Sequence, residues 1–136
     1  MKPLNFVKNC KFYIWKENFA IVKAKRTRPD AFANIIDKNE ITLVIEQGKV
    51  NKKEVIEIEK NWKILTFDMV LPFGLVGFLA TVSKALADEG ISIYVISAYS
   101  TDHILMKEKD ITKAKKKLKS LGCKVVKDSL SVAHLE

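Results

Sequence analysis

The chain has 136 residues and a formal net charge of +8 at pH 7, with 48% hydrophobic and 29% charged residues. This length fits one compact domain or two very small ones that share a core, and the composition is that of a soluble globular protein. No apolar run reaches the roughly 18 to 20 residues that span a bilayer. The start, MKPLNFVKNCKFYIWKENF, lacks the apolar core and cleavage site of a signal peptide. We therefore expect a cytoplasmic protein.

The first half is predicted to contain three strands and one short helix. The strands cover residues 11–17, 19–25 and 41–46, and the helix covers residues 31–36. A tight turn at Asn18 is expected to join the first two strands, and Pro29-Asp30 is expected to open the helix. The charged segment 49–60 is the natural seam between the two halves of the chain.

The second half shows clearer alternation and helical spacing. Strands are predicted over residues 63–70, 91–99, 103–108 and 123–128, and helices over residues 73–89 and 111–122. The resulting order β-α-β-β-α-β is that of an α+β, ferredoxin-like sandwich. The first half reads as a shorter version, so we predict two lobes, residues 1–60 (abbreviated) and 61–136. A cleft between such lobes is a preferred place for small-molecule sites.

The cysteines and histidines form no recognisable chemical motif. Cys10 and Cys123 lie far apart and belong to no CxxC or Cys/His cluster, so we expect small buried residues and neither a disulfide framework nor a zinc site. His103 and His134 are the only histidines, and no nucleophile elbow or HExxH helix accompanies them. We interpret His103 as a half-exposed structural residue. The prediction is a protein that is not an enzyme and needs no metal or cofactor.

The lysines between residues 113 and 119 make nucleic acid a candidate partner. However, Ile111, Ala114, Leu118 and Leu121 form one apolar stripe between them, which is typical of a helix with one buried and one solvated face. Arg26 and Arg28 are the only arginines of the chain, although arginine is the better bidentate partner of phosphate. The central strands also lack the aromatic pattern of ferredoxin-like RNA binders. RNA binding remains the alternative hypothesis.

Two polar segments are candidates for ligand binding. The turn from Pro72 to Gly77 leads from a strand into a helix, whose first amides carry a positive dipole end that suits a ligand carboxylate. The stretch from Ser97 to Asp102 offers hydroxyl groups and one carboxylate that suits an ammonium group. Together they would form an α-amino-acid receptor. The alternative for Ser97 to Asp102 is a hairpin turn bonded to its own backbone.

The sequence from Leu71 to Gly122 resembles an ACT domain in its glycine-bearing turn, its helix ending in LADEGI and its ISAYSTDHILM strand pair. The likeness extends upstream through FAIVKAK, NEITLVIE and NWKILTF, and it is nearest to small two-lobed ACT-like proteins related to amino-acid sensors. The resemblance implies ligand contacts at Phe73, Gly74, Val76 and Gly77 in the turn, and at Ser97, Ala98, Tyr99, Thr101 and Asp102. Two positions depart from the family pattern, because Ala98 replaces a hydroxyl residue and His103 replaces an aromatic one.

These observations predict a regulatory or sensory protein that binds an amino acid at an interface between ACT-type lobes. Binding is expected to bias the geometry of that interface and so to act on a separate protein partner. The resemblance also implies a homo-oligomer. A protein-interaction module without a ligand is the third possibility.

Overall fold

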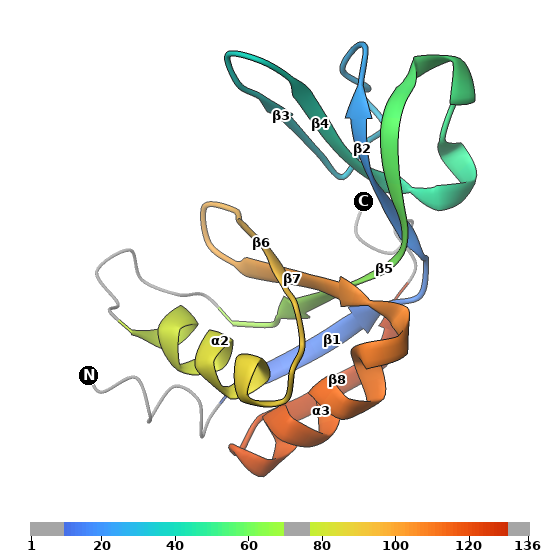
Figure 1. Ribbon diagram of the computed structural model, residues 1–136. Coiled ribbons are helices and arrows are strands. Elements are labelled where there is room, and N and C mark those ends of the chain that lie inside the picture. The colour runs from blue at the N-terminus through green and yellow to red at the C-terminus, as the bar shows by residue number, and fades with distance from the viewer. Residues whose placement is uncertain (1–9, 70–76, 131–136) are drawn as a thin grey trace. The chain divides into compact units, whose positions relative to one another are not determined.

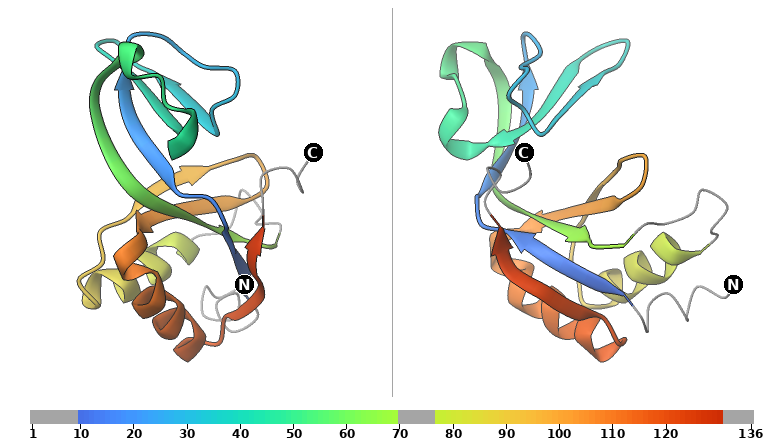
Figure 2. Two further views of the ribbon diagram at one scale, coloured as in Figure 1. Left: turned by 90° about the vertical axis from the view of Figure 1, so that its right-hand side faces the viewer. Right: turned by 180° about the vertical axis from the view of Figure 1, so that it is seen from behind.

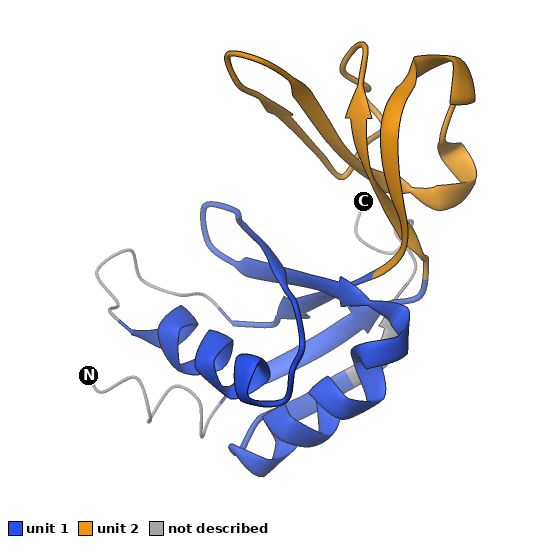
Figure 3. Cartoon of the chain, viewed as in Figure 1, with its two compact units in different colours: residues 1–16, 63–136 blue, residues 17–62 orange. Residues whose placement is uncertain are grey.

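The computed structural model describes residues 10–69 and 77–130. The chain divides into two compact units: unit 1 comprises residues 1–16 and 63–136, and unit 2 comprises residues 17–62 (Figure 3). The boundary expected at residue 60 lies close to the end of unit 2 at residue 62, whereas the division at residues 16 and 17 was not expected. Within the described residues, no helix is long and apolar enough to cross a membrane.

Unit 1 is a five-stranded sheet with two helices on one face (Figures 1 and 2). Its strands are β1 (Lys11–Trp15), the last part of β5 (Val55–Phe67), β6 (Tyr94–Ser97), β7 (Asp102–Lys107) and β8 (Lys124–Leu130). Its helices are α2 (Phe78–Asp88) and α3 (Ile111–Ser120), the latter preceded by a 3-10 turn, Glu108–Asp110. The succession β5-α2-β6-β7-α3-β8 confirms the predicted α+β, ferredoxin-like order.

Strand β1 has an unexpected place in this sheet. The strand order is β6-β7-β5-β1-β8, so β1 lies between the first and last strands of the ferredoxin-like succession, antiparallel to β5 and parallel to β8. A tight turn at Asn18 was expected to join β1 to the next strand, but among the described strands these two are not paired with each other. The alternating residues of β1 suit a central position: Phe12 and Ile14 pack on the helix side, and Trp15 is buried as well.

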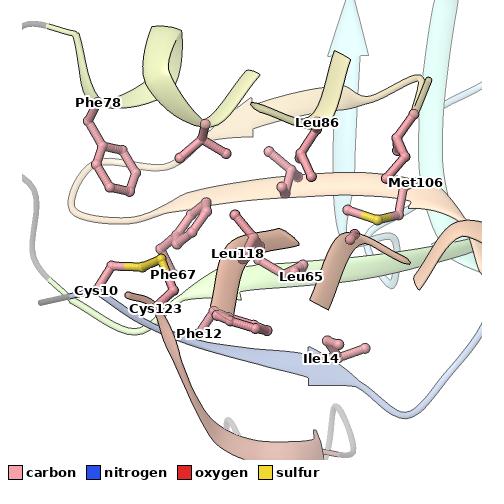
Figure 4. Packing of buried hydrophobic residues seen from close by; sticks show 14 residues of the cluster. Cys10, Phe12, Ile14, Leu65, Phe67, Phe78, Leu86, Met106, Leu118 and Cys123 are labelled. Atoms are coloured by element: carbon pink, nitrogen blue, oxygen red, sulfur yellow. A yellow bond between two sulfur atoms is a disulfide. The ribbon is translucent and has the colours of Figure 1, made fainter. Parts of the chain in front are cut away.

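The core of unit 1 lies between the sheet and its helices (Figure 4). Phe12, Phe67 and Leu118 are fully buried there. The expectation of no disulfide is wrong: Cys10 and Cys123 form one within this core, with Cα atoms 4.6 Å apart. They meet because β1 and β8 are neighbours, and the Lys124 amide donates to the Cys10 carbonyl at 2.9 Å.

Unit 2 is a four-stranded antiparallel sheet. Its order is β3 (Ala33–Ile36), β4 (Ile41–Glu46), β2 (Phe19–Ala24) and the first part of β5. The predicted helix over residues 31–36 is wrong, because this segment forms strand β3 against β4. Its two β-branched isoleucines favour a strand. Unit 2, whose residues are all described, contains only the 3-10 turns Gln47–Lys49 and Lys52–Glu54 beside its strands.

Polar contacts hold the loops of unit 2. The Arg28 guanidinium binds both carboxylate oxygens of Asp30, at 2.9 and 2.8 Å, and donates to the Lys49 carbonyl. Arg26 forms an ion pair with Glu54 at 2.9 Å. Both arginines of the chain are thus engaged in fastening loops.

Strand β5 has a left-handed residue at Asn61, with a φ of 65°, where its pairing register with β2 shifts. The amide N–H of Asn61 donates to the side-chain oxygen of Gln47 at 2.7 Å, and the Gln47 side chain donates back at 3.2 Å. Asparagine is one of the few residues that tolerates this conformation. Asn61 is the residue before Trp62, the last residue of unit 2.

Candidate functional site

The predicted polar stretch is a hairpin between β6 and β7. Ser97 and Asp102 are the last pair of the ladder, and the Ala98 amide donates to the Thr101 carbonyl at 2.8 Å. Tyr99, at the tip, is 82% exposed, whereas Thr101 and Asp102 are partly buried. The hairpin interpretation is therefore correct, and Asp102 stands where the turn meets the sheet.

Gly77 begins helix α2. It is the N-cap residue with a left-handed φ of 93°, and the helix has no side-chain cap at this end. The Gly77 carbonyl accepts two hydrogen bonds of 2.9 Å, from the amide and the hydroxyl of Thr81. The first-turn amides of α2 therefore lack the usual capping side chain. The other predicted turn residues, Phe73, Gly74 and Val76, lie outside the described residues.

The hairpin and the start of α2 lie at the same end of the sheet. Strand β7 lies between β6 and β5, so β6 is not a direct neighbour of β5. Nevertheless, the β6–β7 turn, the end of β5 and the first turn of α2 share one end of unit 1 in every view (Figures 1 and 2).

Asp102 also lies on the helix side of the sheet. Ile104 and Met106, at alternate positions along β7, pack into the core beneath the helices. Since successive residues of a strand point to opposite faces, Asp102 shares their face and His103 has the other. A carboxylate and the N-terminus of a helix, two groups of opposite electrostatic character, thus occupy one side of one end of the sheet.

A buried polar cluster lies on the opposite, helix-free face. The Trp15 indole N–H donates to the Thr66 hydroxyl at 2.8 Å, and that hydroxyl lies 2.7 Å from Nδ1 of His103. Thr66 is 2% exposed and His103 is 8% exposed, so the expectation of a half-exposed histidine is wrong. Three adjacent strands, β1, β5 and β7, contribute one residue each. We define these three residues, Trp15, Thr66 and His103, as the cross-strand cluster.

The protonation of this cluster follows from its burial. Desolvation lowers the pKa of His103 below its usual value of 6.5, and the charge of Asp102 offsets part of this effect. Desolvation raises the pKa of Tyr13, a neighbour of Thr66 on β1, while a hydrogen bond with Thr66 acts in the other direction. His103 is therefore a neutral imidazole near pH 7. The neutral ring with its proton on Nε2 satisfies the cluster, because Thr66 then accepts from Trp15 and donates to Nδ1.

The remaining features considered from the sequence are the lysines of α3 and a possible metal site. Ala114 and Leu118 of α3 are buried, and Lys113, Lys116 and Lys119 are exposed, which is the predicted division of that helix. Within the described part of the chain, no group of three His, Cys, Asp or Glu side chains could hold a metal ion. Sequence reasoning missed the cross-strand cluster, for which the only local signal was a histidine in an apolar strand.

Comparisons with known proteins support the fold. A family model described as ACT domain matches residues 57–120, and no curated protein matches the chain. A solved protein from Agrobacterium tumefaciens has 18% identity and a TM-score of 0.78, covering 90% of this chain and 96% of its own. A Vibrio cholerae protein of unknown function, described as a possible transport protein, has 20% identity and a TM-score of 0.71, with coverages of 88% and 94%.

The regulatory subunit of aspartate kinase from Thermus thermophilus is a third structure of similar fold. It has 9% identity and a TM-score of 0.62, covering 81% of this chain and 95% of its own. At such identities these likenesses concern the fold alone.

Proposed function

We propose that this chain, whose residues 57–120 match the ACT domain family model, is a regulatory protein that binds an amino acid. The family assignment supports a regulatory, small-molecule-binding role in general terms. The amino acid is the finer part of the proposal. It rests on one observation, the presence of Asp102 and the start of α2 on the same side and at the same end of the unit 1 sheet.

The chemistry of these two groups matches the two ends of an α-amino acid. The Asp102 carboxylate would pair with the ligand ammonium group, and the first amides of α2 after Gly77 would receive the ligand carboxylate. Gly77 has no Cβ to block that approach. Ser97, Ala98, Tyr99 and Thr101 would line the site from the hairpin, and Phe73, Gly74 and Val76 from the turn. No catalytic step is part of this proposal.

A second copy of the chain is expected to complete the site. Among the described strands, β6 pairs only with β7, so its other edge has no described partner strand, and Val95 on β6 is 39% exposed. Open edges with apolar side chains readily pair with another strand. Ligand bound beside this edge would favour one geometry of the pair, which a protein effector would then detect.

The two-lobed organisation belongs to the same proposal. We propose that unit 2, residues 17–62, is the abbreviated lobe and that unit 1 is the complete one. This assignment moves strand β1 from the lobe predicted at residues 1–60 to the lobe predicted at residues 61–136.

A thermal-shift screen of the common amino acids tests the function. A ligand present at about 100 times its dissociation constant adds roughly 2.7 kcal/mol to the stability of the folded protein, so the melting temperature of the protein should rise. Asp102→Asn should abolish the rise. The matched variant Asp88→Asn, at an exposed ion pair on α2, should keep it. A flat screen would rule out the proposed ligand class, and salt-sensitive RNA binding lost with the α3 lysines would favour the alternative.

A further inference from the structure

The cross-strand cluster adjoins Asp102 in the chain, the residue proposed to bind the ligand ammonium group. His103 follows Asp102 at the start of β7, and its ring is tied through Thr66 on β5 to Trp15 on β1. All three side chains are at least nine-tenths buried. The middle of the sheet therefore holds one end of β7 through side-chain hydrogen bonds as well as through the backbone ladder.

We propose that His103 is a positioning residue of the amino-acid site: its ring, fastened through Thr66 to Trp15, fixes the start of β7 and thereby the carboxylate of Asp102. This inference rests on the function proposed above, because it concerns the same carboxylate. His103 itself lies on the opposite face of the sheet and does not touch the ligand.

The local geometry explains why such an anchor is needed. Asp102 is the first residue of β7 and belongs to the last pair of the ladder, and beyond it one backbone bond, from Ala98 to Thr101, closes the turn. Among the described strands β6 has β7 as its single partner, so the hairpin is held to the rest of the sheet through β7 alone. Because consecutive residues share a backbone, fixing the His103 ring restricts the direction of the Asp102 side chain.

The anchor depends on the protonation of His103. In the neutral ring Nδ1 accepts from the Thr66 hydroxyl, whereas a protonated ring donates from both nitrogens, so the Thr66 hydroxyl must turn its proton away from His103 and the cluster rearranges. The surrounding groups determine when this happens. Asp102 supplies a negative charge from β7, Tyr13 on β1 is a neutral phenol, and Asp68 lies at the end of β5 beyond Thr66. Ile96, the partner of His103 on β6, has no ionisable group.

The test needs no ligand and begins with Trp62→Phe, which leaves Trp15 as the single tryptophan. Acidification from pH 7.5 to 5 should change Trp15 fluorescence with a midpoint below 6.5. Over the same range, hydrogen exchange at the Ala98 amide, corrected for its intrinsic pH dependence, should accelerate about tenfold as the turn loosens. In His103→Asn, whose side-chain oxygen can accept from Thr66 without titrating, both changes should disappear. The matched control His134→Asn removes the other histidine and should retain both.

Two results would overturn the proposal. One is a Trp15 titration with no change at the Ala98 amide, because His103 would then be structural only. The other is acceleration of Ala98 exchange that persists in His103→Asn. The titration of the protein without a His103 substitution decides the matter even if that variant folds poorly.

A second arm separates this inference from the proposed function. The thermal-shift screen is repeated at pH 7.5 and pH 5, with the common amino acids as probes. A shift that weakens at pH 5, and is constant in His103→Asn, supports both proposals. If Ala98 exchange depends on the protonation of His103 but no amino acid raises the melting temperature, the ligand class is refuted and the anchoring of the turn is supported.

Discussion

Replacing Thr66 by valine isolates the hydroxyl group at the centre of the cross-strand cluster. The Thr66 oxygen lies 2.8 Å from the Trp15 indole nitrogen and 2.7 Å from Nδ1 of His103, and its side chain is 2% exposed. Valine keeps the shape of threonine, so it creates little cavity. It leaves one buried donor and one buried acceptor without their partner. Each such group costs about 1–3 kcal/mol, and together they predict a loss of about 2–6 kcal/mol.

Urea unfolding followed by tryptophan fluorescence and circular dichroism measures this loss. With a slope of about 2 kcal/mol per molar urea, the middle of the usual range, the midpoint should fall by roughly 1–3 M. The matched control is Thr81→Val on α2. Its hydroxyl bonds the Gly77 carbonyl, which also accepts the Thr81 amide, so about 0.5 kcal/mol or less is expected. A Thr66→Val midpoint no lower than that of Thr81→Val would refute the reasoning.

Three further changes test other parts of the structure. His103 has a lowered pKa in the folded state, so the unfolded state binds more protons below pH 6.5. Stability should therefore be present above that pH and be lost as the pH falls toward the folded pKa, and unfolding midpoints at pH 7.5 and 5 should show this slope in the native chain but not in His103→Asn. Reducing the Cys10–Cys123 bond should lower the melting temperature, with a loss of about 2–5 kcal/mol, and an unchanged value in a calorimetric scan would contradict a stabilising role. Asn61→Gly should be nearly neutral, whereas Asn61→Val should cost about 1–2 kcal/mol in urea unfolding because φ is 65°; equal midpoints would contradict that strain.

The second half of the chain was predictable because its signals are local. Ala114 and Leu118 recur at helical spacing and are buried, and Gly90 and Gly122 end their helices with positive φ values. Each of these signals lies within one or two helical turns. The segment 31–36 is too short to show a helical or a strand periodicity, and its isoleucines lie in strand β3 and not in a helix.

Long-range pairing was not predictable in the same way. Strand β1 pairs with β8, more than a hundred residues later, and neither strand contains a local mark of the other. The Cys10–Cys123 pair follows from that neighbourhood and was missed with it. At the site, the hairpin and its carboxylate were foreseen from the polar residues around Asp102. The cross-strand cluster was not, because Thr66 and Trp15 resemble ordinary strand residues until three strands are aligned.

The placement of β1 makes unit 2 a domain insertion. β1 and β5 are antiparallel neighbours with Ile14 opposite Leu65, so the chain leaves unit 1 after Lys16 and re-enters it at Lys63 at the same end of the sheet. The Lys63 ammonium group donates to the Lys16 carbonyl at 2.7 Å. A two-residue turn could therefore replace all of unit 2 and convert β1 and β5 into an ordinary hairpin. The proposed site residues all belong to unit 1, so comparing such a shortened chain with the whole protein would show which properties depend on unit 2.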